Sequence, residues 1–595
     1  MIHDPAFKHP SGPSGQSQAT PSPSDDEDSF RSGRSRSGPE AETHPQAVDV
    51  CVIGTGAGGG ILAHQLALAG LRVVSLEQGQ PLGGDYFKTV SPPGASRDFG
   101  IGPDTRWPSD PHDGLFIHPL FAPGDEGSTA RPPNGFRHFQ VIALDGLQSL
   151  WNGVSVRFGE ADFAGWPISY QTLAPHYAAV ESLITVCGTV ENLPQLPDGE
   201  FVPPKPLRPA DHLVIEAVRG LRDGESHAIS NRKAINTRPG MANSCVSTGI
   251  CTSGCPVGSA YKFSARLLPE IAGLDNYRLI TGAKVTRLLR AAETDHIESV
   301  EYLDTASGQR HLLKARVVVL ATGAIESPRI LFNSADEREP GGLGNHHDQV
   351  GRGLQDNPKV VLSTSLWKLW GKRRDYDIGY ADLLILLSRG RLSDGSHFPF
   401  IGHAIHGIPD FPHYLEVMRG LPVVLKERLA RSLFYSYVTL GLFCAGEITV
   451  HNRVRPGATQ DRYGVRQVHV DFAVPDLAAR QMDVMMAWGR KVLRRASATR
   501  LYETRDNSGT GIHYAGTTGM SASPLHGVVD ADLKVHGLRN LYICDGGVIP
   551  RLPDKHLTLT IMALSHRLAQ HLGRELGAQA GTPQAKSQAA DTLAA

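Results

Sequence analysis

Two motifs, one near each end of the chain, carry residue types that can do redox chemistry. Gly54, Gly56 and Gly59 form a G-x-G-x-x-G pattern, which is typical of loops that bind the pyrophosphate of a dinucleotide. His513 lies far down the chain and is followed by Gly516 and a threonine. An imidazole has a pKa near neutrality, so it can take up the proton of a hydroxyl group while hydride leaves the carbon that bears this group. Together the motifs predict oxidation of an alcohol by a bound redox dinucleotide.

The glycine loop lies between elements that suit a parallel sheet. Residues 48–53 are rich in β-branched side chains and predict a buried strand, and residues 61–70 predict a helix ended by a glycine. The first glycine permits a tight turn, the second lets the backbone approach a phosphate, and the third allows close helix–strand contact. A second strand, residues 71–76, leads to Glu77, whose carboxylate can bind the ribose hydroxyls of an adenosine. This order predicts dinucleotide binding without distinguishing FAD from NAD.

Two more apolar runs lead into small or acidic residues. They are residues 315–320, followed by Thr322 and Gly323, and residues 541–544, followed by Asp545 and Gly546. Small residues belong where the backbone comes close to a bound ligand. We expect these segments and Glu77 to lie at the carboxyl ends of strands in one sheet, where doubly wound folds bind ligands. The nucleotide domain is therefore predicted to be assembled from distant parts of the chain.

Five segments resemble the glucose-methanol-choline (GMC) oxidoreductases. They are the glycine loop with Glu77, Gly323-Ala324-Ile325-x-Ser327-Pro328, Gly353-Leu354-Gln355-Asp356-Asn357-Pro358, His513-x-x-Gly516-Thr517 and Asn540-Leu541-Tyr542-x-x-Asp545. The resemblance extends from about residue 48 to about residue 572. It implies FAD as cofactor and oxidation of an alcohol to a carbonyl. It also implies an α/β fold, in which a Rossmann-like FAD-binding domain is joined to an α+β substrate domain built on an antiparallel sheet.

The resemblance further implies roles for single residues. It puts Trp151, Asn152 and Gly153 beside the isoalloxazine ring, Val285 near the adenine, and Asp545 near the ribityl-pyrophosphate part. His513 matches the first of two residues that face the flavin N5 from the substrate side. The second falls at His556, where family members often have Asn-Pro and this chain has His-Leu. This difference leaves two roles open for His556, a second base or a hydrogen-bond donor to the substrate oxygen.

Three cysteines, Cys245, Cys251 and Cys255, lie close together in the sequence. Three thiolates in a glycine-containing loop suit a 3Fe-4S cluster, whereas zinc usually takes four ligands. The spacing is similar to that in catalytic subunits of bacterial FAD-dependent sugar and polyol dehydrogenases. That similarity implies a cytochrome c subunit and a small subunit with a twin-arginine signal as partners. Reduced structural thiols and a disulfide are the alternatives. The other cysteines are expected to be small buried apolar residues: Cys51, Cys187, Cys444 and Cys544.

Composition and charge limit the other function classes. Among 595 residues, 59 Lys and Arg balance 60 Asp and Glu, so nothing favours nucleic acid or an anionic membrane as partner. A small-molecule alcohol or sugar is expected instead. No apolar run reaches the roughly 18–20 residues that span a bilayer, and the start of the chain lacks the apolar core of a secretion signal. We expect a cytoplasmic protein, or one at the periplasmic face of the inner membrane if a partner carries it there.

Motifs and composition also predict the domain boundaries. Residues 1–46 are rich in Ser, Pro and charged side chains and predict a disordered arm, and residues 576–595 predict a loose tail. The FAD-binding domain is predicted from residues 47–165, 246–340 and 506–575, and the substrate domain from residues 166–245 and 341–505. Within the substrate domain, residues 432–438 and 446–450 have strand-like composition, and residues 477–498 have the apolar spacing of a helix.

Three alternatives to a dehydrogenase stay open at this point. An oxygen-dependent alcohol or sterol oxidase would need no cluster, and a carbon–carbon lyase on the same fold would need FAD only structurally. A non-catalytic electron-transfer or scaffold subunit is disfavoured because both candidate histidines are present. Peroxide release would favour the oxidase, and bleaching of the flavin by a sugar without oxygen would exclude the lyase and the scaffold.

Overall fold

The strands that carry the dinucleotide motifs form one parallel sheet. Its five strands lie in the order β21-β12-β2-β3-β8, and every neighbouring pair is parallel. Their bounds are Leu541–Ile543 (β21), Ala315–Leu320 (β12), Val48–Ile53 (β2), Val73–Glu77 (β3) and Tyr277–Thr281 (β8). The carboxyl ends of these strands therefore share one edge, which carries Gly54, Glu77, Thr322 and Asp545 as the sequence predicts.

This computed structural model describes most of the chain between residues 42 and 577. The described residues are 42–43, 48–81, 121–122, 137–138, 140–241, 243–247, 251, 255, 257–372, 381–405, 420–422, 424–425, 428–429, 433, 436–505, 510–511 and 513–577. The predicted arm and tail lie outside them, apart from residues 42–43 and 576–577. Within the described part, no helix is long and apolar enough to cross a bilayer.

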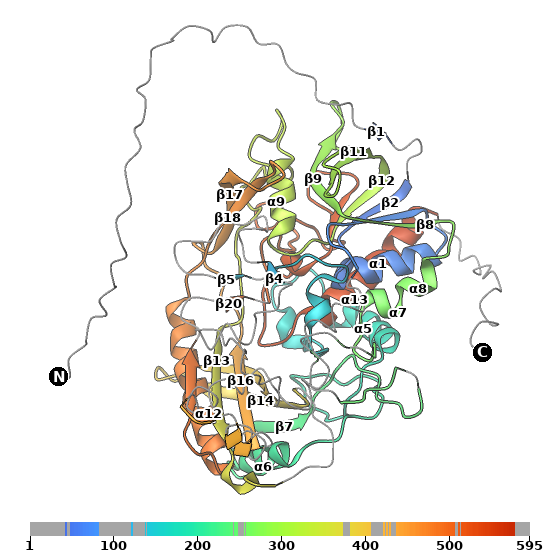
Figure 1. Cartoon of the computed structure of the whole chain (residues 1–595). Coiled ribbons are helices and arrows are strands. Elements are labelled where there is room, and N and C mark those ends of the chain that lie inside the picture. Colours follow the sequence, from blue (N-terminus) through green and yellow to red (C-terminus); the bar gives the residue numbers. More distant parts are fainter. Residues whose placement is uncertain are drawn as a thin grey trace, which may run out of the picture. The chain divides into compact units, whose positions relative to one another are not determined.

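Three helices pack together beside the parallel sheet. They are α1 (Ala57–Leu68), α5 (Tyr170–Ile184) and α13 (Thr558–Glu575). Helix α1 starts directly after the glycine loop and packs along α13, which in turn packs on α5 (Figure 1). Ser565 in α13 donates a hydrogen bond to the Gly58 carbonyl in α1, with 2.5 Å between the oxygens. The end of the chain thus holds the helix that begins at the predicted phosphate loop.

A smaller sheet and a hairpin accompany the parallel sheet. The sheet contains β1 (Glu42–Thr43), β11 (Arg310–Leu313), β10 (Ile297–Asp304) and β9 (Ala283–Arg290). The hairpin consists of β17 (Arg453–Gln460) and β18 (Arg466–Asp471), and α9 (Glu326–Asn333) contacts both it and β9. The chain also forms short strands, helices and 3-10 helices (η). They are β4 (Phe121–Ala122), β5 (Arg137–His138), β6 (Gln140–Val141), η1 (Gly146–Leu150), η2 (Glu160–Phe163), α7 (Phe263–Arg266), α8 (Leu268–Ile271), η4 (Trp367–Leu369), β20 (Thr510–Gly511) and η7 (Gly546–Val548).

The substrate domain is built on a six-stranded antiparallel sheet, as the family resemblance implies. Its order is β19-β13-β16-β15-β14-β7. The bounds are Tyr502–Arg505, Lys359–Ser365, Tyr437–Cys444, His397–Ile405, Leu383–Arg391 and Ser226–Ser230, in that order. One face packs against α12 (Asp476–Arg495) and α6 (Pro209–Arg219). On the other face, Ile401 and Phe443 cluster with Val154 and Val156, which follow the Trp151 segment.

Two expectations for the substrate domain need comment. The helix predicted at residues 477–498 is α12, but the strand predicted at residues 446–450 is wrong. Gly446 N–H donates to Leu552 O at 3.0 Å instead of joining a ladder, and Ile448 and Val450 are exposed. The β-branched residues of this segment therefore do not pack on a sheet. Of the strand predicted at residues 432–438, only Tyr437 and Val438 are in β16, and residues 432, 434 and 435 lie outside the described part.

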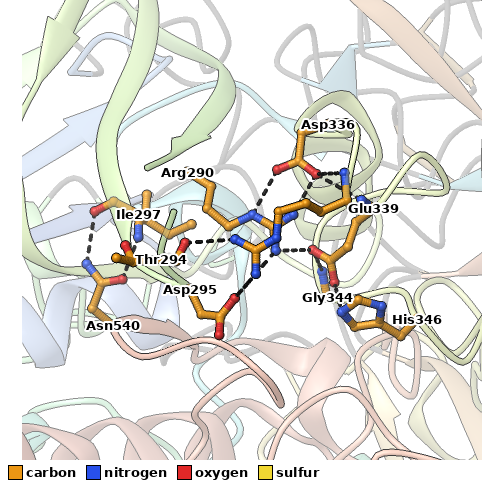
Figure 2. A network of polar contacts seen from close by, with 10 residues as sticks. Arg290, Thr294, Asp295, Ile297, Asp336, Glu339, Gly344, His346 and Asn540 are labelled. Atoms are coloured by element: carbon orange, nitrogen blue, oxygen red, sulfur yellow. Dashed lines mark hydrogen bonds and ion pairs between the residues drawn. The ribbon is translucent and has the colours of Figure 1, made fainter. Parts of the chain in front are cut away.

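A buried ion network holds the end of β9 to the segment after α9 (Figure 2). Arg290 contacts Asp336, with 2.5 Å between Nη2 and Oδ1, and Glu339, with 3.1 Å between Nη1 and Oε2. Glu339 also accepts from Gly344 N–H at 3.1 Å and contacts His346. Since Arg290 and Glu339 are both almost fully buried, each needs the other to offset its desolvation.

We predict that Glu339→Gln lowers the free energy of unfolding by about 2–3 kcal/mol, because buried Arg290 loses its only almost fully buried carboxylate partner among the described residues. Urea unfolding of the purified protein measures this loss. The matched variant Glu337→Gln, at an exposed position two residues away, should change it by less than about 0.5 kcal/mol. Equal effects of the two variants would contradict the role assigned to the network.

Candidate active site

The glycine loop is packed too tightly for side chains at two of its three motif positions. Gly54 has a φ of +94°, and a Cβ there would lie 2.6 Å from Ala321 O. A Cβ on Gly59 would lie 1.9 Å from Gly54 O, so only glycine lets α1 start this close to β2. A Cβ on Gly56 would meet nothing closer than Asp145 O at 3.8 Å. The loop therefore has free space only beside Gly56, where the backbone can approach a phosphate.

Glu77 is fixed at the end of β3 by the glycine loop. Its Oε2 accepts from Thr55 N–H at 3.0 Å and from Thr55 Oγ1 at 2.6 Å, and its Oε1 accepts from Gly79 N–H at 2.8 Å. Burial raises the pKa of the carboxyl above its usual range, and these hydrogen bonds oppose that shift. The carboxylate is thus oriented before any ligand arrives.

Asp545 joins the two other strand ends at the same edge. Its Oδ2 accepts from Gly323 N–H at 3.0 Å and from Ser327 Oγ at 2.5 Å, and its Oδ1 accepts from Gly547 N–H at 2.8 Å. Thr322 Oγ1 lies 2.8 Å from Ser327 Oγ. The segments after β12 and β21 are therefore held together through one buried carboxylate, whose pKa burial raises.

The segment that carries His513 is attached directly to this edge. Tyr514 packs directly against Gly546. A Cβ added to Gly546 would lie 2.4 Å from Tyr514 O. Thr517 Oγ1 donates to Ala324 O at 2.5 Å, and Thr518 N–H donates to Gly547 O at 3.0 Å. The histidine motif and the dinucleotide motifs are far apart in the sequence, but they lie together at this edge of the parallel sheet.

Asn357 fixes the protonation pattern of His513. Its Nδ2 donates to Cys444 O at 2.7 Å and to Pro553 O at 2.8 Å, so the amide NH2 group faces the two carbonyls. Its Oδ1 therefore faces His513 Nδ1, at 2.8 Å, and can only accept. Consequently the proton of the neutral imidazole sits on Nδ1, and Nε2 keeps its lone pair. The side chain of His513 is oriented as a base at Nε2.

His556 stands next to His513 on a loop that precedes α13. The ring centroids of the two histidines are 4.9 Å apart. Phe443, on β16, packs its ring 5.6 Å from the first and 4.9 Å from the second. His556 is 7% exposed, and its Nδ1 is buried without a hydrogen-bond partner. Its neighbour Lys555 is anchored by Asp554 and Asp162 at 2.8 and 2.9 Å, which fixes this loop.

The histidines of this place are all held neutral. Burial, together with the charge of Lys359, lowers the pKa of His513 to about 3. Burial also lowers the pKa of His556 well below its usual range, and the neighbouring histidines add to the shift. A third histidine, His403, has its pKa lowered to about 3 by burial and by the charge of Lys233. At neutral pH each ring therefore offers one N–H donor and one lone pair.

The other residues predicted to contact the cofactor lie in two parts of the structure, the segment at Trp151 and strand β9. Trp151, Asn152 and Gly153 lie beside the substrate sheet, because Val154 belongs to the same buried cluster as Phe443. The Trp151 indole N–H donates to Tyr261 O at 2.8 Å. Val285 is buried in β9, away from the histidines, and its carbonyl accepts from Arg329 in α9 at 3.0 Å. Trp151 itself packs against the core of the parallel sheet, and Val285 lies in the smaller sheet.

The described residues around the cysteine triplet show no metal site. All three thiols are free, and Cys245 and Cys255 pack against a small cluster of Cys187, Ile235 and Ala260. Among the residues that the structure describes, no group of three or more His, Cys, Asp or Glu side chains is placed to hold a metal ion. The 3Fe-4S cluster therefore stays a prediction that the described residues do not support. The four scattered cysteines are buried or almost buried, as predicted: Cys51, Cys187, Cys444 and Cys544.

Two buried side chains near the edge of the parallel sheet have polar atoms without a hydrogen-bond partner. Gln148 is 3% exposed, yet neither atom of its amide group has a hydrogen-bond partner, and Thr518 Oγ1 is likewise buried and unpaired. Gln148 follows a turn at Gly146, whose Cβ would lie 3.8 Å from Gly56. Buried polar atoms in native proteins normally have partners, so a ligand is expected to supply these.

Three family models match parts of the chain. Two models described as GMC oxidoreductase match residues 229–359 and 449–565, and a model described as an NAD(P)-binding Rossmann-like domain matches residues 52–116. The chain belongs to the GMC oxidoreductase family. The matched stretches include Asn357, His513 and His556, which meet in the structure.

Several relatives of this GMC oxidoreductase act on hydroxyl-bearing compounds, by their names. The chain is 29% identical to the 6'''-hydroxyparomomycin C oxidase of Streptomyces lividus, over 91% of this chain and 94% of that one. It is 25% identical to the fructose dehydrogenase large subunit of Gluconobacter japonicus, over 89% and 98%. The solved structure of the formate oxidase of Aspergillus oryzae RIB40 has a TM-score of 0.60 at 15% identity, covering 89% of this chain and 98% of that one. This last likeness supports the fold.

Sequence reasoning missed two polar residues of this GMC site. Asn357 lies in one of the five family segments, which was an available signal, but no role was assigned to it. His403 lies on β15, in the middle of the chain, where the sequence carries no motif. Its closeness to His556 depends on how the antiparallel sheet packs against the loop that carries His556. The sequence does not show this packing.

We predict that Asn357→Ala lowers the free energy of unfolding by about 2–4 kcal/mol, because two buried carbonyls lose their donors. Differential scanning calorimetry and urea unfolding measure the loss. The control Asn333→Ala removes a single exposed amide hydrogen bond, to Arg466 O, and should cost less than about 1 kcal/mol. A stability of Asn357→Ala equal to that of the control would contradict the buried bonding described above.

Proposed function

We propose that this protein oxidises an alcohol to a carbonyl with FAD as the hydride acceptor. The observation that carries the proposal is the pair of neutral histidines 4.9 Å apart, attached to the edge of a dinucleotide-binding sheet. The residues that would hold FAD are the glycine loop, Glu77, Asp545 and the segment from Gln148 to Gly153. When bound, the flavin supplies the two-electron chemistry that protein side chains lack.

His513 is proposed as the base. Its Nε2 lone pair takes the hydroxyl proton of the substrate, because Nδ1 already carries the proton that faces Asn357. As that proton leaves, the electron pair on oxygen forms the carbonyl and hydride leaves the carbon. Asn357 is the positioning residue, since it holds the ring in the tautomer that has its lone pair on Nε2.

His556 is proposed to bind the substrate oxygen. Its neighbour on the loop is an anchored Lys555, so the ring has a fixed position beside His513. A neutral imidazole can donate one hydrogen bond to the oxygen while His513 removes its proton. This assigns His556 as a hydrogen-bond donor in preference to a second base, because two bases would compete for the same proton.

A sugar or polyol is the proposed substrate class. The names of the aminoglycoside oxidase and the fructose dehydrogenase subunit support a hydroxyl-rich compound. Three neutral imidazoles also suit neutral hydroxyl groups better than a carboxylate, which prefers cationic partners. Oxygen is the alternative electron acceptor, and the oxidase relative supports it. Peroxide release in air would assign the protein to the oxidases.

The proposed partners rest on the family resemblance and on one relative. A cytochrome c subunit, a small twin-arginine-signal subunit and a periplasmic location stay predictions. The name of the fructose dehydrogenase large subunit supports only the general idea of partner subunits. A dye or a quinone can take the place of these acceptors in an assay. No step of the proposed reaction uses the cysteine triplet.

We predict that His513→Asn lowers kcat about 10²–10⁴-fold while FAD stays bound, because the base is lost and the fold is kept. The test mixes the protein with sugars and polyols without oxygen and follows the flavin absorbance. Wild type should be bleached by at least one of them. The control His526→Asn, at an exposed position of the same region, should be bleached as fast as wild type. Bleaching of His513→Asn at the wild-type rate would overturn the role of His513, and no bleaching of wild type would overturn the function.

The pH dependence of kcat/KM should show no acid limb near neutrality. Because burial lowers the pKa of His513 to about 3, Nε2 stays unprotonated as the pH falls through the ordinary histidine pKa of about 6.5. We predict a constant kcat/KM from neutral pH down to about pH 5, measured by dye reduction. The neutral histidines also cost stability below about pH 6.5, since the unfolded chain binds protons that the folded chain does not. Assay after return to pH 7 separates that unfolding from catalysis, and a half-loss near pH 6.5 would contradict the assignment.

A further inference from the structure

A third histidine lies on the substrate side of the pair. His403 is in β15, opposite Gly441 of β16 and Leu384 of β14. Residues two apart in a strand share a face, so His403 lies on the same face as Ile401, which packs with Phe443. Its ring centroid is 4.8 Å from that of His556. The substrate sheet thus contributes its own imidazole to the place where the two catalytic histidines meet.

His403 is buried with an unsatisfied nitrogen. It is 6% exposed, and its Nδ1 has no hydrogen-bond partner. His556 Nδ1, on the adjacent ring, is unsatisfied in the same way. Such an atom destabilises the structure when nothing replaces the water that it lost. Two of them on neighbouring rings beside the base point to a ligand that bonds to both.

The charges around His403 select the kind of group that it can bind. Lys233 lies behind it and is paired with Asp382, with 3.1 Å between Nζ and Oδ1. Lys205 and Arg208 reach the same carboxylate at 3.6 and 3.7 Å, and Lys233 is the charged group that acts on His403. A cationic substrate group is therefore disfavoured next to His403. A neutral imidazole matches a hydroxyl group, because both offer one donor and at least one acceptor.

We propose that His403 is a substrate-positioning residue that binds a second hydroxyl group, on the carbon next to the one that is oxidised. His403 and His556 then hold neighbouring oxygens while His513 removes a proton from one of them. The preferred substrates are vicinal diols, as in polyols and sugars, and monohydric alcohols are poor substrates. This inference rests on the proposed alcohol oxidation and adds a specificity to it.

The test compares substrates that differ by a single hydroxyl group. The probes are 1,2-propanediol against 1-propanol, and D-glucose against its deoxy analogues, in a dye-linked assay of the FAD-loaded protein. Wild type should prefer the member with neighbouring hydroxyls by about 10–100-fold in kcat/KM. His403→Leu should lose this preference by lowering kcat/KM for the diol only. His403→Asn should keep part of it, because an amide atom can take the place of Nδ1.

The control His397→Leu makes the same change at an exposed position of the same strand and should leave both substrates unaffected. Thermal unfolding midpoints of all variants report the integrity of the fold. If His403→Leu lowers kcat/KM for both members of a pair equally, or keeps the wild-type preference, the inference is overturned. If His403→Leu does not fold, loss of the entire preference in folded His403→Asn overturns it. A wild-type protein that oxidises no member of any pair overturns the proposed function, and this inference with it.

Discussion

The hydrogen bond between His513 and Asn357 is the interaction on which the site depends. The same amide also bonds the carbonyls of Cys444, at the end of substrate strand β16, and Pro553, on the loop that leads to His556. One buried side chain thus sets the tautomer of the base and ties three separate segments of the chain around it. Because each of its polar atoms has a partner, any other orientation of the amide would leave buried groups unsatisfied.

The rest of the fold brings these segments to a dinucleotide. A parallel sheet collects strand ends from the beginning, middle and end of the chain, and Asp545 joins the last two of them through backbone amides. The His513 segment packs on the turn after Asp545, so the proposed base and the proposed dinucleotide site lie at the same carboxylate-anchored edge. The antiparallel sheet adds Phe443 and His403 from the opposite side. Burial between these elements lowers the pKa of all three histidines.

The sequence predicts the parallel sheet well because its signals are local. A β-branched run, a glycine loop and a helix follow one another directly around Gly54, and their packing needs glycine at fixed places. The strand expected at residues 446–450 is absent, because Gly446 forms a backbone hydrogen bond with Leu552. Amino-acid composition does not reveal such a contact. The role of Asn357 depends on two carbonyls far away in sequence, and that of His403 on strand register. The cysteines of the triplet are close in sequence, and two of them, Cys245 and Cys255, pack against a small apolar cluster.

The state of the His513 ring tests this account most directly. Nitrogen-15 NMR of histidine-labelled protein, with His513→Asn used to assign the signal, reports which ring nitrogen carries the proton. We predict a neutral ring with its proton on Nδ1 at pH 7, unchanged down to about pH 5, because burial lowers the pKa of His513 to about 3. A ring protonated on both nitrogens at pH 6, or a neutral ring with its proton on Nε2, would contradict the assignment of Nε2 as the base.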